Sequence, residues 1–459
     1  MEPWLLETPF GFSIDMSFWQ TFLSLPPLEM IKAIFVVLAW WLIAILLFRK
    51  ALNEWMAFKQ KEHLKTWQWT VLAVDIPAEF VQSPKAVEQI FVNLSGAQIN
   101  YSVYERYFEG KLPRWFSFEI ISIEGYIQFV VRTEVSFRDL VEAAIYAQYS
   151  EAEITEVEDY VTMIPEVFPN TEFEAQGAEF SLAESEVYPI RTYPEFEYTI
   201  SKDVVFTDPM AAILENFSRI GPGEHLWMQI AILPVDNSWK QDGIDLVKKI
   251  VANKKEPKTG GLVGMVGSAP EWVLKNAIQA WNYDFSVEEE KKKKEDAVGK
   301  VSDLTPGAKA VIESIEDKIS KLGFKCRVRV LYAAKNELFK PHKCVQGLIG
   351  AMNQFYINNR NGFKAKIIGG QDIVTAYKTR ALKFNDDPYI LNIEELATIW
   401  HFPLPLVKTP LIQKANIKRG EPPINLPVEH FTMPLKSKAV GPKIEEKPKE
   451  VKLEDLPYA

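Results

Sequence analysis

The sequence predicts an α+β protein with one membrane-spanning helix near its amino terminus. Three observations support this class: a long uncharged segment, alternating strand and helix patterns after it, and the composition of a folded chain. Of the 459 residues, 47% are hydrophobic and 25% are charged. The two cysteines are too few for a disulfide framework and fit a reducing compartment. This composition excludes a wholly disordered, collagen-like or disulfide-stapled chain.

The membrane-spanning helix is predicted from the segment that ends at Phe48. No charged side chain occurs from Ala33 to Phe48. About 18 helical residues span about 27 Å, which is close to the roughly 30 Å hydrocarbon core of a bilayer. A buried core helix would rarely run so far without a polar face. The residues expected to span the membrane include Ile31, Ala33, Phe35, Trp40, Trp41, Leu47 and Phe48.

The basic residues follow the apolar segment, whereas a cleaved signal peptide carries them in front. They are Arg49, Lys50, Lys59, Lys61 and Lys65. The positive-inside rule therefore predicts a single-pass protein of the cell membrane, with its amino terminus outside and its bulk in the cytoplasm. Membrane lipid is then an expected partner. Residues 28–50 form the predicted span, and residues 51–66 form a juxtamembrane helix or linker. The aromatic-rich leader, residues 1–27, is expected to form an interfacial helix, with a flexible leader as the alternative.

Two ferredoxin-like (split βαβ) cytoplasmic domains are expected after the anchor. Residues 67–165 show the order β-α-β-β-α-β, with a hairpin turn at Glu124-Gly125. Residues 166–370 show a related order, beginning with a predicted strand at Glu179–Pro189, and carry a long insertion at 253–303. Two unrelated α+β units are the alternative. The insertion contains glycine, tryptophan and a charge run that is typical of a solvated segment, although contact with the membrane is a second hypothesis.

The carboxy-terminal part is expected to contain a helix and an extended segment over 371–427, and a disordered tail over 428–459. Asn392 followed by Glu395 has the spacing of a capping box, which predicts a helix at Ile393–Trp400. The following His401-Phe-Pro403 is expected to end that helix, because proline disfavours a helical residue before it.

The sequence carries no recognisable catalytic motif. A phosphate-binding loop needs Gly-Lys-Ser/Thr, which is absent, and the histidines lack metal-ligand spacing. We therefore expect a non-enzymatic protein without cofactor or metal. Lys325, Arg327 and Arg329 alternate along one strand and are predicted to share one face. Such a stripe is a candidate surface for nucleic acid or an acidic partner, although an ordinary solvated face is the alternative. The net charge of −9 weighs against a general nucleic-acid-coating protein.

Several segments resemble an uncharacterised family of membrane-anchored proteins. They are Lys325–Lys335, Gly350–Phe355, Ile390-Leu-Asn-Ile-Glu-Glu-Leu-Ala-Thr-Ile-Trp-His-Phe-Pro403, Val407-Lys-Thr-Pro410 and Gly420-Glu-Pro-Pro-Ile-Asn-Leu-Pro427. Members of that family occur mostly in reduced-genome bacteria and look like the amino-terminal portion of conjugation or type IV secretion DNA-transfer ATPases. This chain ends without a motor domain, so the resemblance implies that a separate ATPase is the partner. The implied motor-adjacent residues are Asn392, Glu395, Trp400, His401, Pro403, Pro422 and Pro423.

The expected function is therefore to tether or organise a partner ATPase in a type IV secretion-like, conjugative apparatus. One alternative is an oligomeric membrane scaffold similar in layout to stomatin and prohibitin proteins, which requires a homo-oligomer. The other is a membrane-anchored nucleic-acid-binding protein, which requires the Lys325, Arg327 and Arg329 face to be accessible. The cargo, the partner and the stoichiometry do not follow from the sequence.

Overall fold

The computed structural model describes residues 5–7, 13–15, 22, 26–77, 82–200, 203–206, 208–252, 304–382 and 387–404. The chain divides into two compact units. The first comprises Met1–Trp67 and Ile99–Pro113, and the second comprises Gln68–Gln98 and Arg114–Ala459. The predicted insertion at 253–303 and the predicted tail lie outside the described residues.

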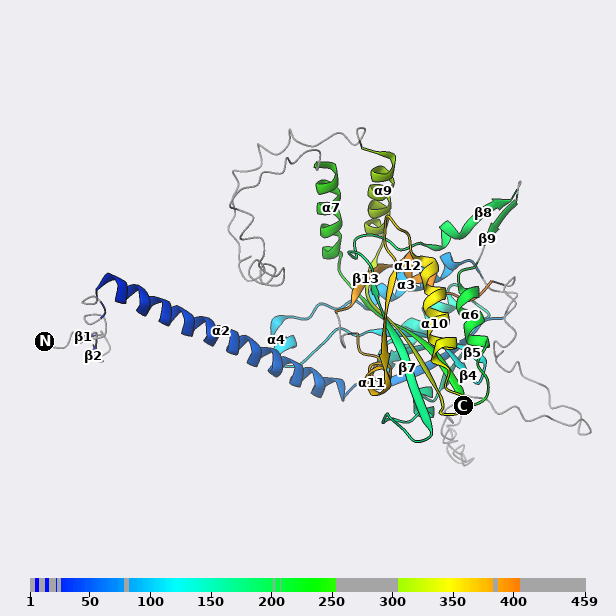
Figure 1. Cartoon of the computed structure of the whole chain (residues 1–459), viewed down its shortest axis with the longest axis horizontal. Helices are drawn as coiled ribbons and strands as arrows, with labels where there is room; N and C mark the ends of the chain where they lie inside the picture. The colour runs from blue at the N-terminus through cyan, green and yellow to red at the C-terminus, as the bar shows by residue number, and fades with distance from the viewer. Residues whose placement is uncertain are drawn as a thin grey trace, which may run out of the picture. The chain divides into compact units, whose positions relative to one another are not determined.

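The first unit is built on α2, a continuous 38-residue helix from Pro27 to Leu64 (Figure 1). Pro27 suits the first helical position because its missing N–H would have no partner there. The predicted spanning segment and the predicted juxtamembrane segment are therefore parts of one helix. A short helix, α4 (Val103–Tyr107), begins at a capping box in which Ser102 and Glu105 each accept the other's backbone N–H.

Most of the leader lies outside the described residues, so the expected interfacial helix remains a prediction; Phe22 is helical. Nearer the amino terminus, β1 (Leu5–Glu7) pairs antiparallel with β2 (Ser13–Asp15). The sequence places Pro3 and Pro9 in this stretch. Because proline disfavours a helical residue before it, a helix through the leader is interrupted at two positions.

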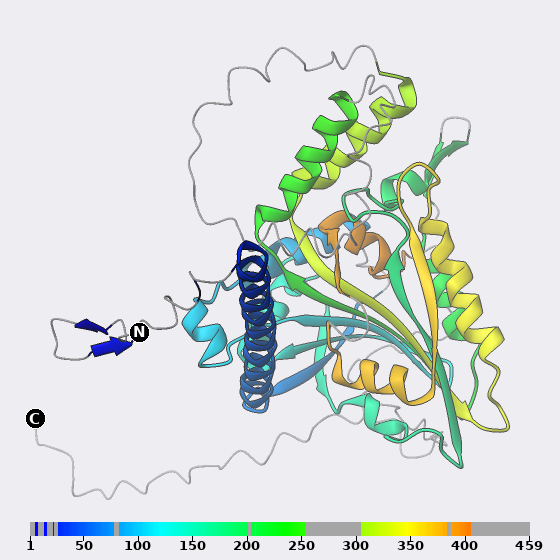
Figure 2. The ribbon, with the colours of Figure 1, turned by 60° about the vertical axis from the view of Figure 1, so that its left-hand side comes forward.

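The second unit contains a nine-stranded sheet whose strand pairs are all antiparallel (Figure 2). Its path is β12-β7-β11-β10-β4-β5-β3-β6, and β13 pairs with β11. The strands are β3 (Trp69–Asp75), β4 (Phe116–Ile123), β5 (Tyr126–Glu134), β6 (Glu153–Val157), β7 (Phe173–Leu182), β10 (Glu224–Pro234), β11 (Gly323–Lys335), β12 (Phe363–Gly369) and β13 (Tyr389–Asn392).

The sheet path joins two halves of similar strand order. In the amino-terminal half the path is β6-β3-β5-β4, which is the fourth, first, third and second strand in chain order. In the carboxy-terminal half the path is β12-β7-β11-β10, with the same order. The second strands of the two halves, β4 and β10, pair with each other over eight residues of β4. Hydrogen bonds therefore continue from one half into the other.

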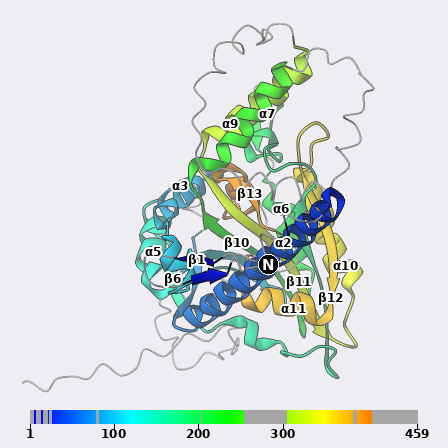
Figure 3. The same ribbon diagram turned by 90° about the vertical axis from the view of Figure 1, so that its left-hand side faces the viewer.

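Helices cover both faces of this sheet. One face packs against α3 (Pro84–Leu94), α5 (Arg138–Tyr146), α6 (Met210–Ser218), α10 (Pro341–Met352) and α12 (Ile393–Ile399). Figure 3 shows α3 and α5 side by side near β6. The other face packs against α11 (Gly370–Thr379) and the turn Tyr160–Met163. Two further helices, α7 (Lys240–Ala252) and α9 (Pro306–Ser320), pack against each other, and β8 (Glu197–Ile200) pairs with β9 (Asp203–Phe206).

The close approach of α11 to the sheet requires a glycine. A Cβ on Gly177 of β7 would lie 2.1 Å from the Val330 carbonyl oxygen and 2.7 Å from Ile373 Cγ1 of α11. Both distances are shorter than real Cβ contacts, so a side chain at this position forces the strand or the helix to move.

The α+β class expected from the sequence is confirmed, and so is a single amino-terminal helix of spanning length and apolar character in the described chain. The two separate ferredoxin-like domains are not established, because their expected strands join one continuous sheet. The strand expected at Glu179–Pro189 is wrong in its bounds, since β7 runs from Phe173 to Leu182. The first half of this strand mixes Gln, Gly and Glu with apolar residues, so it shows no clear strand pattern in the sequence.

Candidate functional site

The most unusual feature of the second unit is a row of polar side chains across the middle of its sheet. Glu179, Arg329, Gln229 and Glu119 lie directly opposite one another on four adjacent strands, β7, β11, β10 and β4. All four are at most 2% exposed. Arg329 Nε donates to Glu179 Oε1 at 3.0 Å, and its Nη1 donates to Gln229 Oε1 at 3.3 Å. Gln229 Nε2 in turn donates to Glu119 Oε1 at 3.2 Å.

Arg380 closes this network from the end of α11. Its Nε donates to Glu119 Oε1 at 2.7 Å and its Nη2 to Glu119 Oε2 at 3.2 Å. The remaining N–H groups reach both oxygens of Asp159 at 2.8 Å. Tyr160 donates to Glu119 Oε2 at 2.6 Å, and its hydroxyl lies 3.0 Å from that of Tyr377. We call the set Glu119, Asp159, Tyr160, Glu179, Gln229, Arg327, Arg329, Tyr377 and Arg380 the buried polar network; Asp159, whose side chain is 32% exposed, lies at its edge.

The electrostatics of the network follow from burial and pairing. Burial alone would lower the pKa of Arg380, but the carboxylates of Glu119 and Asp159 raise it well above its usual value. Burial would raise the pKa of Asp159, and the Arg380 guanidinium nevertheless holds it below its usual range. Burial raises the pKa of Tyr160 and Tyr377 far above 10, so both hydroxyls stay protonated and act as hydrogen-bond donors.

The charged side chains of the network form ion pairs with one another. Arg327 and Arg329 both contact Glu179, and Arg380 contacts Glu119 and Asp159. Ion pairs of this kind fix geometry, because a charge left without its partner in the interior is costly. The Glu119–Gln229 contact lies at the β4–β10 junction, where it links the two halves of the sheet. The arrangement is therefore suited to setting the register of this junction.

The expectation for Lys325, Arg327 and Arg329 requires a correction. Lys325 is exposed, but Arg327 and Arg329 are 0% exposed. The period-two alternation is correct, but this face is covered, and acidic and polar partners on neighbouring strands hold the two arginines. Neither arginine is on an accessible surface for nucleic acid or an acidic protein.

The expected motor-adjacent segment also requires a correction. The capping box at Asn392 and Glu395 is present, with the Glu395 N–H donating to Asn392 Oδ1 at 2.8 Å. However, Glu395 is fully buried and forms an ion pair with Lys318 at 3.0 Å. Trp400 is 0% exposed, and its ring lies 4.8 Å from that of Phe118. This part of the segment belongs to the core and is not an exposed handle.

His401 is held in the same core. Its Nε2 lies 3.0 Å from Asp208 Oδ1, and its Nδ1 lies 2.7 Å from the Ala397 carbonyl oxygen. Burial would raise the pKa of Asp208, but the hydrogen bond from His401 lowers it below its usual range. Pro403 is half-buried, whereas Pro422 and Pro423 lie outside the described residues.

The residues expected to span the membrane lie on α2 with their side chains exposed. Phe35 is 70% exposed, Trp40 68%, Trp41 65% and Phe48 65%. Ile31 and Leu47 are also exposed, and Ala33 lies within the helix. The basic residues Arg49, Lys50, Lys59, Lys61 and Lys65 follow on the same helix or at its end. An apolar surface of this length needs lipid or protein around it, because water does not favour it.

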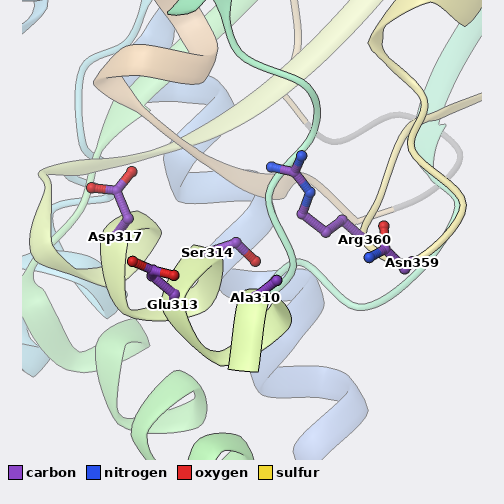
Figure 4. Close-up of a pocket in the computed structure, with 6 residues that line it drawn as sticks. All are labelled: Ala310, Glu313, Ser314, Asp317, Asn359 and Arg360. Atoms are coloured by element: carbon purple, nitrogen blue, oxygen red, sulfur yellow. The ribbon is translucent and has the colours of Figure 1, made fainter. Parts of the chain in front are cut away.

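The described surface also contains two shallow depressions. Figure 4 shows one, of about 360 Å³, lined by Glu313, Ser314 and Asp317 of α9 and by Arg360 and Asn359 of a facing loop. A larger one, of about 810 Å³, lies between α7 and the loop after β7, and its lining includes five acidic residues and one basic residue, Lys249. In the part of the chain that is described, no three His, Cys, Asp or Glu residues are grouped to hold a metal ion.

Sequence reasoning missed the residues at the centre of the network. Glu119 interrupts the otherwise uncharged strand Phe116–Ile123, and Gln229 interrupts the apolar strand around it. A lone charged residue inside a continuous apolar strand indicates a buried partner. That signal was available for Glu119, but the position of Arg380, 261 residues away along the chain, depends on the tertiary fold.

The fold and network together define an α+β protein with one amino-terminal helix of membrane-spanning length and with ion pairs buried in its sheet unit. Residues 108–415 match the model of a protein family described as a domain of unknown function, DUF8128. The match covers more than half of the chain, so the protein belongs to this family. It begins after α2 and includes the whole buried polar network. A search of curated proteins finds no match.

Proposed function

We propose that this protein is a non-enzymatic, single-pass membrane protein that tethers a partner ATPase of a type IV secretion-like, conjugative apparatus. The observation that carries the proposal is α2, whose apolar segment is exposed along its length. The basic residues after Phe48 favour an orientation with the amino terminus outside and the sheet unit in the cytoplasm. A protein of this layout holds its cytoplasmic unit at the bilayer.

The resemblance to the amino-terminal portion of DNA-transfer ATPases supports the choice of partner. Because the segment from Asn392 to His401 is buried in the core, we assign contact with the motor to residues after 404, which include Pro422 and Pro423. We also propose that each half of the sheet is a ferredoxin-like unit. Its support is the order of fourth, first, third and second strand, which occurs in both halves.

Anchoring and tethering are tested separately. Leu38→Arg places a charge in the middle of the apolar segment, which costs about 2.5–3.5 kcal/mol on insertion scales. We expect the full chain to remain in membranes at high pH and the Leu38→Arg variant to be released in part. The matched control is Lys61→Arg, which keeps the charge. Complete retention of Leu38→Arg would contradict the assignment of α2 as the anchor.

Tethering is tested by purifying the tagged full chain from its native host in mild detergent. We expect an ATPase to co-purify, and we expect a variant lacking residues 405–427 to lose it. A separate motor gene next to the gene for this chain supports the proposal, and its absence from many genomes argues against it. Equal recovery of the ATPase with both chains would overturn the assignment of the contact.

A second candidate function, an oligomeric membrane scaffold, is favoured by the two ends of the sheet path. In the described chain β12 carries exposed Lys364 at one end, and β6 carries exposed Glu153 at the other. These charges oppose pairing of like edges and favour pairing of β12 with β6 of another copy. Native mass measurement of the solubilised chain tests this. A large ring without ATPase favours the scaffold, and a monomer excludes it.

A further inference from the structure

The first unit carries a group of large apolar side chains away from the predicted span. Trp55 and Phe58 of α2 are 47% and 55% exposed, and Val103, Tyr104 and Phe108 at α4 are 71%, 62% and 59% exposed. Single exposed apolar residues are common, whereas a contiguous group marks a contact surface. We call these five residues the juxtamembrane aromatic surface.

The side chains of α2 and α4 belong to one region of the first unit because α4 is fixed to α2. Trp55 Nε1 donates to the Tyr107 carbonyl oxygen at 3.1 Å. Gly110, with φ of +69°, lies so close to α2 that a Cβ there would be 2.3 Å from the Lys59 carbonyl oxygen. The rings of Trp55 and Phe58 are 6.5 Å apart, and those of Tyr104 and Phe108 stack at 5.1 Å. The packing therefore holds these rings in place while leaving them exposed.

The contacts with α2 show that the chain is nearer the predicted bilayer at Tyr107, the last residue of α4, than at Gly110. Gly110 lies at the level of Lys59, and Tyr107 lies at the level of Trp55, which is closer to Phe48. Between Gly110 and Tyr107 the chain therefore comes closer to the apolar segment. Tyr104 and Val103 precede Tyr107 in the same short helix. Trp55 is about 10 Å beyond Phe48 along the helix axis. Helical side chains lean toward the amino terminus, so the Trp55 ring leans back toward the bilayer.

The charged side chains that touch the surface offset one another, whereas Arg49 and Lys50 lie on α2 next to the apolar segment. Lys111 contacts Glu105 at 3.0 Å and Glu109 at 2.8 Å, and Lys59 lies 5.2 Å from the centre of the Trp55 ring. Attraction to anionic headgroups is therefore a minor contribution. Amphipathic aromatic rings favour the boundary between headgroups and acyl chains in zwitterionic and anionic bilayers alike.

We propose that the juxtamembrane aromatic surface binds the phospholipid headgroup region, so that α4 is a second membrane contact beside the spanning helix. The occupant is lipid because the surface continues directly from α2, the predicted anchor. This inference rests on the proposed anchoring through α2. Contact at two points restricts the tilt of α2 and the angle at which the chain leaves the bilayer.

The test uses single labelled cysteines in the full chain, reconstituted in phospholipid nanodiscs. The native thiols of Cys326 and Cys344 are 0% and 2% exposed, so labels react selectively with new exposed cysteines. A nitroxide at Tyr104→Cys reports on α4, one at Leu38→Cys reports on the span, and one at Glu313→Cys provides the reference for a solvent-exposed helix. Replacing Tyr104, which is 62% exposed, removes little packing. Relaxation by oxygen, which concentrates in lipid, is compared with relaxation by a water-soluble nickel complex.

We expect the oxygen-to-nickel ratio at Tyr104→Cys to be several-fold above that at Glu313→Cys, and to be unchanged by salt. A ratio equal to the reference, with a high ratio at Leu38→Cys, overturns this inference while leaving the anchor intact. A low ratio at both sites overturns the anchor and this inference together. Shielding of Tyr104→Cys that requires several chains in one disc also overturns the lipid proposal, because the occupant is then a second copy.

Discussion

Removal of the Arg380 guanidinium should destabilise the sheet unit far more than removal of an exposed arginine with similar contacts. Arg380→Met keeps much of the side-chain volume but removes four hydrogen bonds, two to Glu119 and two to Asp159. Glu119 is 0% exposed, so its charge then lies in the interior without its main partner. Loss of one member of a buried pair costs about 3–5 kcal/mol.

Arg138→Met is the matched control. Arg138 also contacts two carboxylates, Glu142 at 2.6 Å and Glu156 at 2.7 Å, but its side chain is 36% exposed. Water and salt screen such pairs, and each contributes about 0–1 kcal/mol. The two variants therefore differ mainly in burial.

The assay is urea unfolding of the full chain in detergent micelles, followed by circular dichroism and tryptophan fluorescence. The fluorescence comes from all 13 tryptophans, among them Trp227, whose ring lies 4.7 Å from that of Tyr160 in the network. With an m value of about 3 kcal/mol/M, the midpoint for Arg380→Met falls by about 1 M or more. Equal midpoints for Arg380→Met and Arg138→Met would refute the reasoning. Adding Glu119→Gln to Arg380→Met should restore part of the loss, since the unpaired charge is then gone.

Three further predictions concern other buried groups. Burial lowers the pKa of His225 from 6.5 to about 4, so His225 is protonated in the unfolded chain at a higher pH than in the folded chain. The free energy of unfolding should therefore fall by about 3 kcal/mol as the pH drops from 6.5 towards 4. His225→Gln should make the unfolding midpoint depend less on pH over this range, and an unchanged pH profile would contradict the assignment. Gly177→Ala should lower the free energy of unfolding by about 1–3 kcal/mol, and with it the melting temperature, because its Cβ meets neighbouring atoms. Gly307→Ala in α9 has open space around its Cβ and should raise the melting temperature slightly. The reverse order would count against the packing of α11 on β7. Lys318→Met leaves Glu395 buried without its cation and should cost about 3–5 kcal/mol in urea unfolding, and a loss below 1 kcal/mol would contradict a stabilising role of this ion pair.

Local patterns in the sequence account for most elements of the fold. The helix α3 begins at Pro84 as its Ser-Pro start predicts, and the hairpin between β4 and β5 turns at Glu124-Gly125, where both residues have positive φ. Local sequence patterns could not predict the pairing of β4 with β10. Both strands are buried on both faces, and the side chains of such a strand do not show which neighbouring strand it pairs with.

The site was harder to predict than the fold, for a related reason. The alternation of Lys325, Arg327 and Arg329 correctly placed the cations on one face of β11, but whether that face is covered depends on α11 and the segment before β13. The capping box at Asn392 was found because it is local, whereas its burial against Lys318 depends on a helix 74 residues earlier. Periodicity gives the direction of a side chain, and only tertiary packing gives its surroundings.

The β4–β10 junction has a consequence for the synthesis of this protein. All strands of the amino-terminal half have left the ribosome once β6 is complete, but β10 begins 101 residues after β4 ends. At a synthesis rate of about 5–20 residues per second, the edge of β4 stays unpaired for roughly 5–20 s before β10 is made. During that interval an eight-residue strand with Glu119 at its centre is open to other chains. Glu119 should then oppose pairing of β4 with an apolar strand of another protein, because its charged side chain would be buried there without a partner.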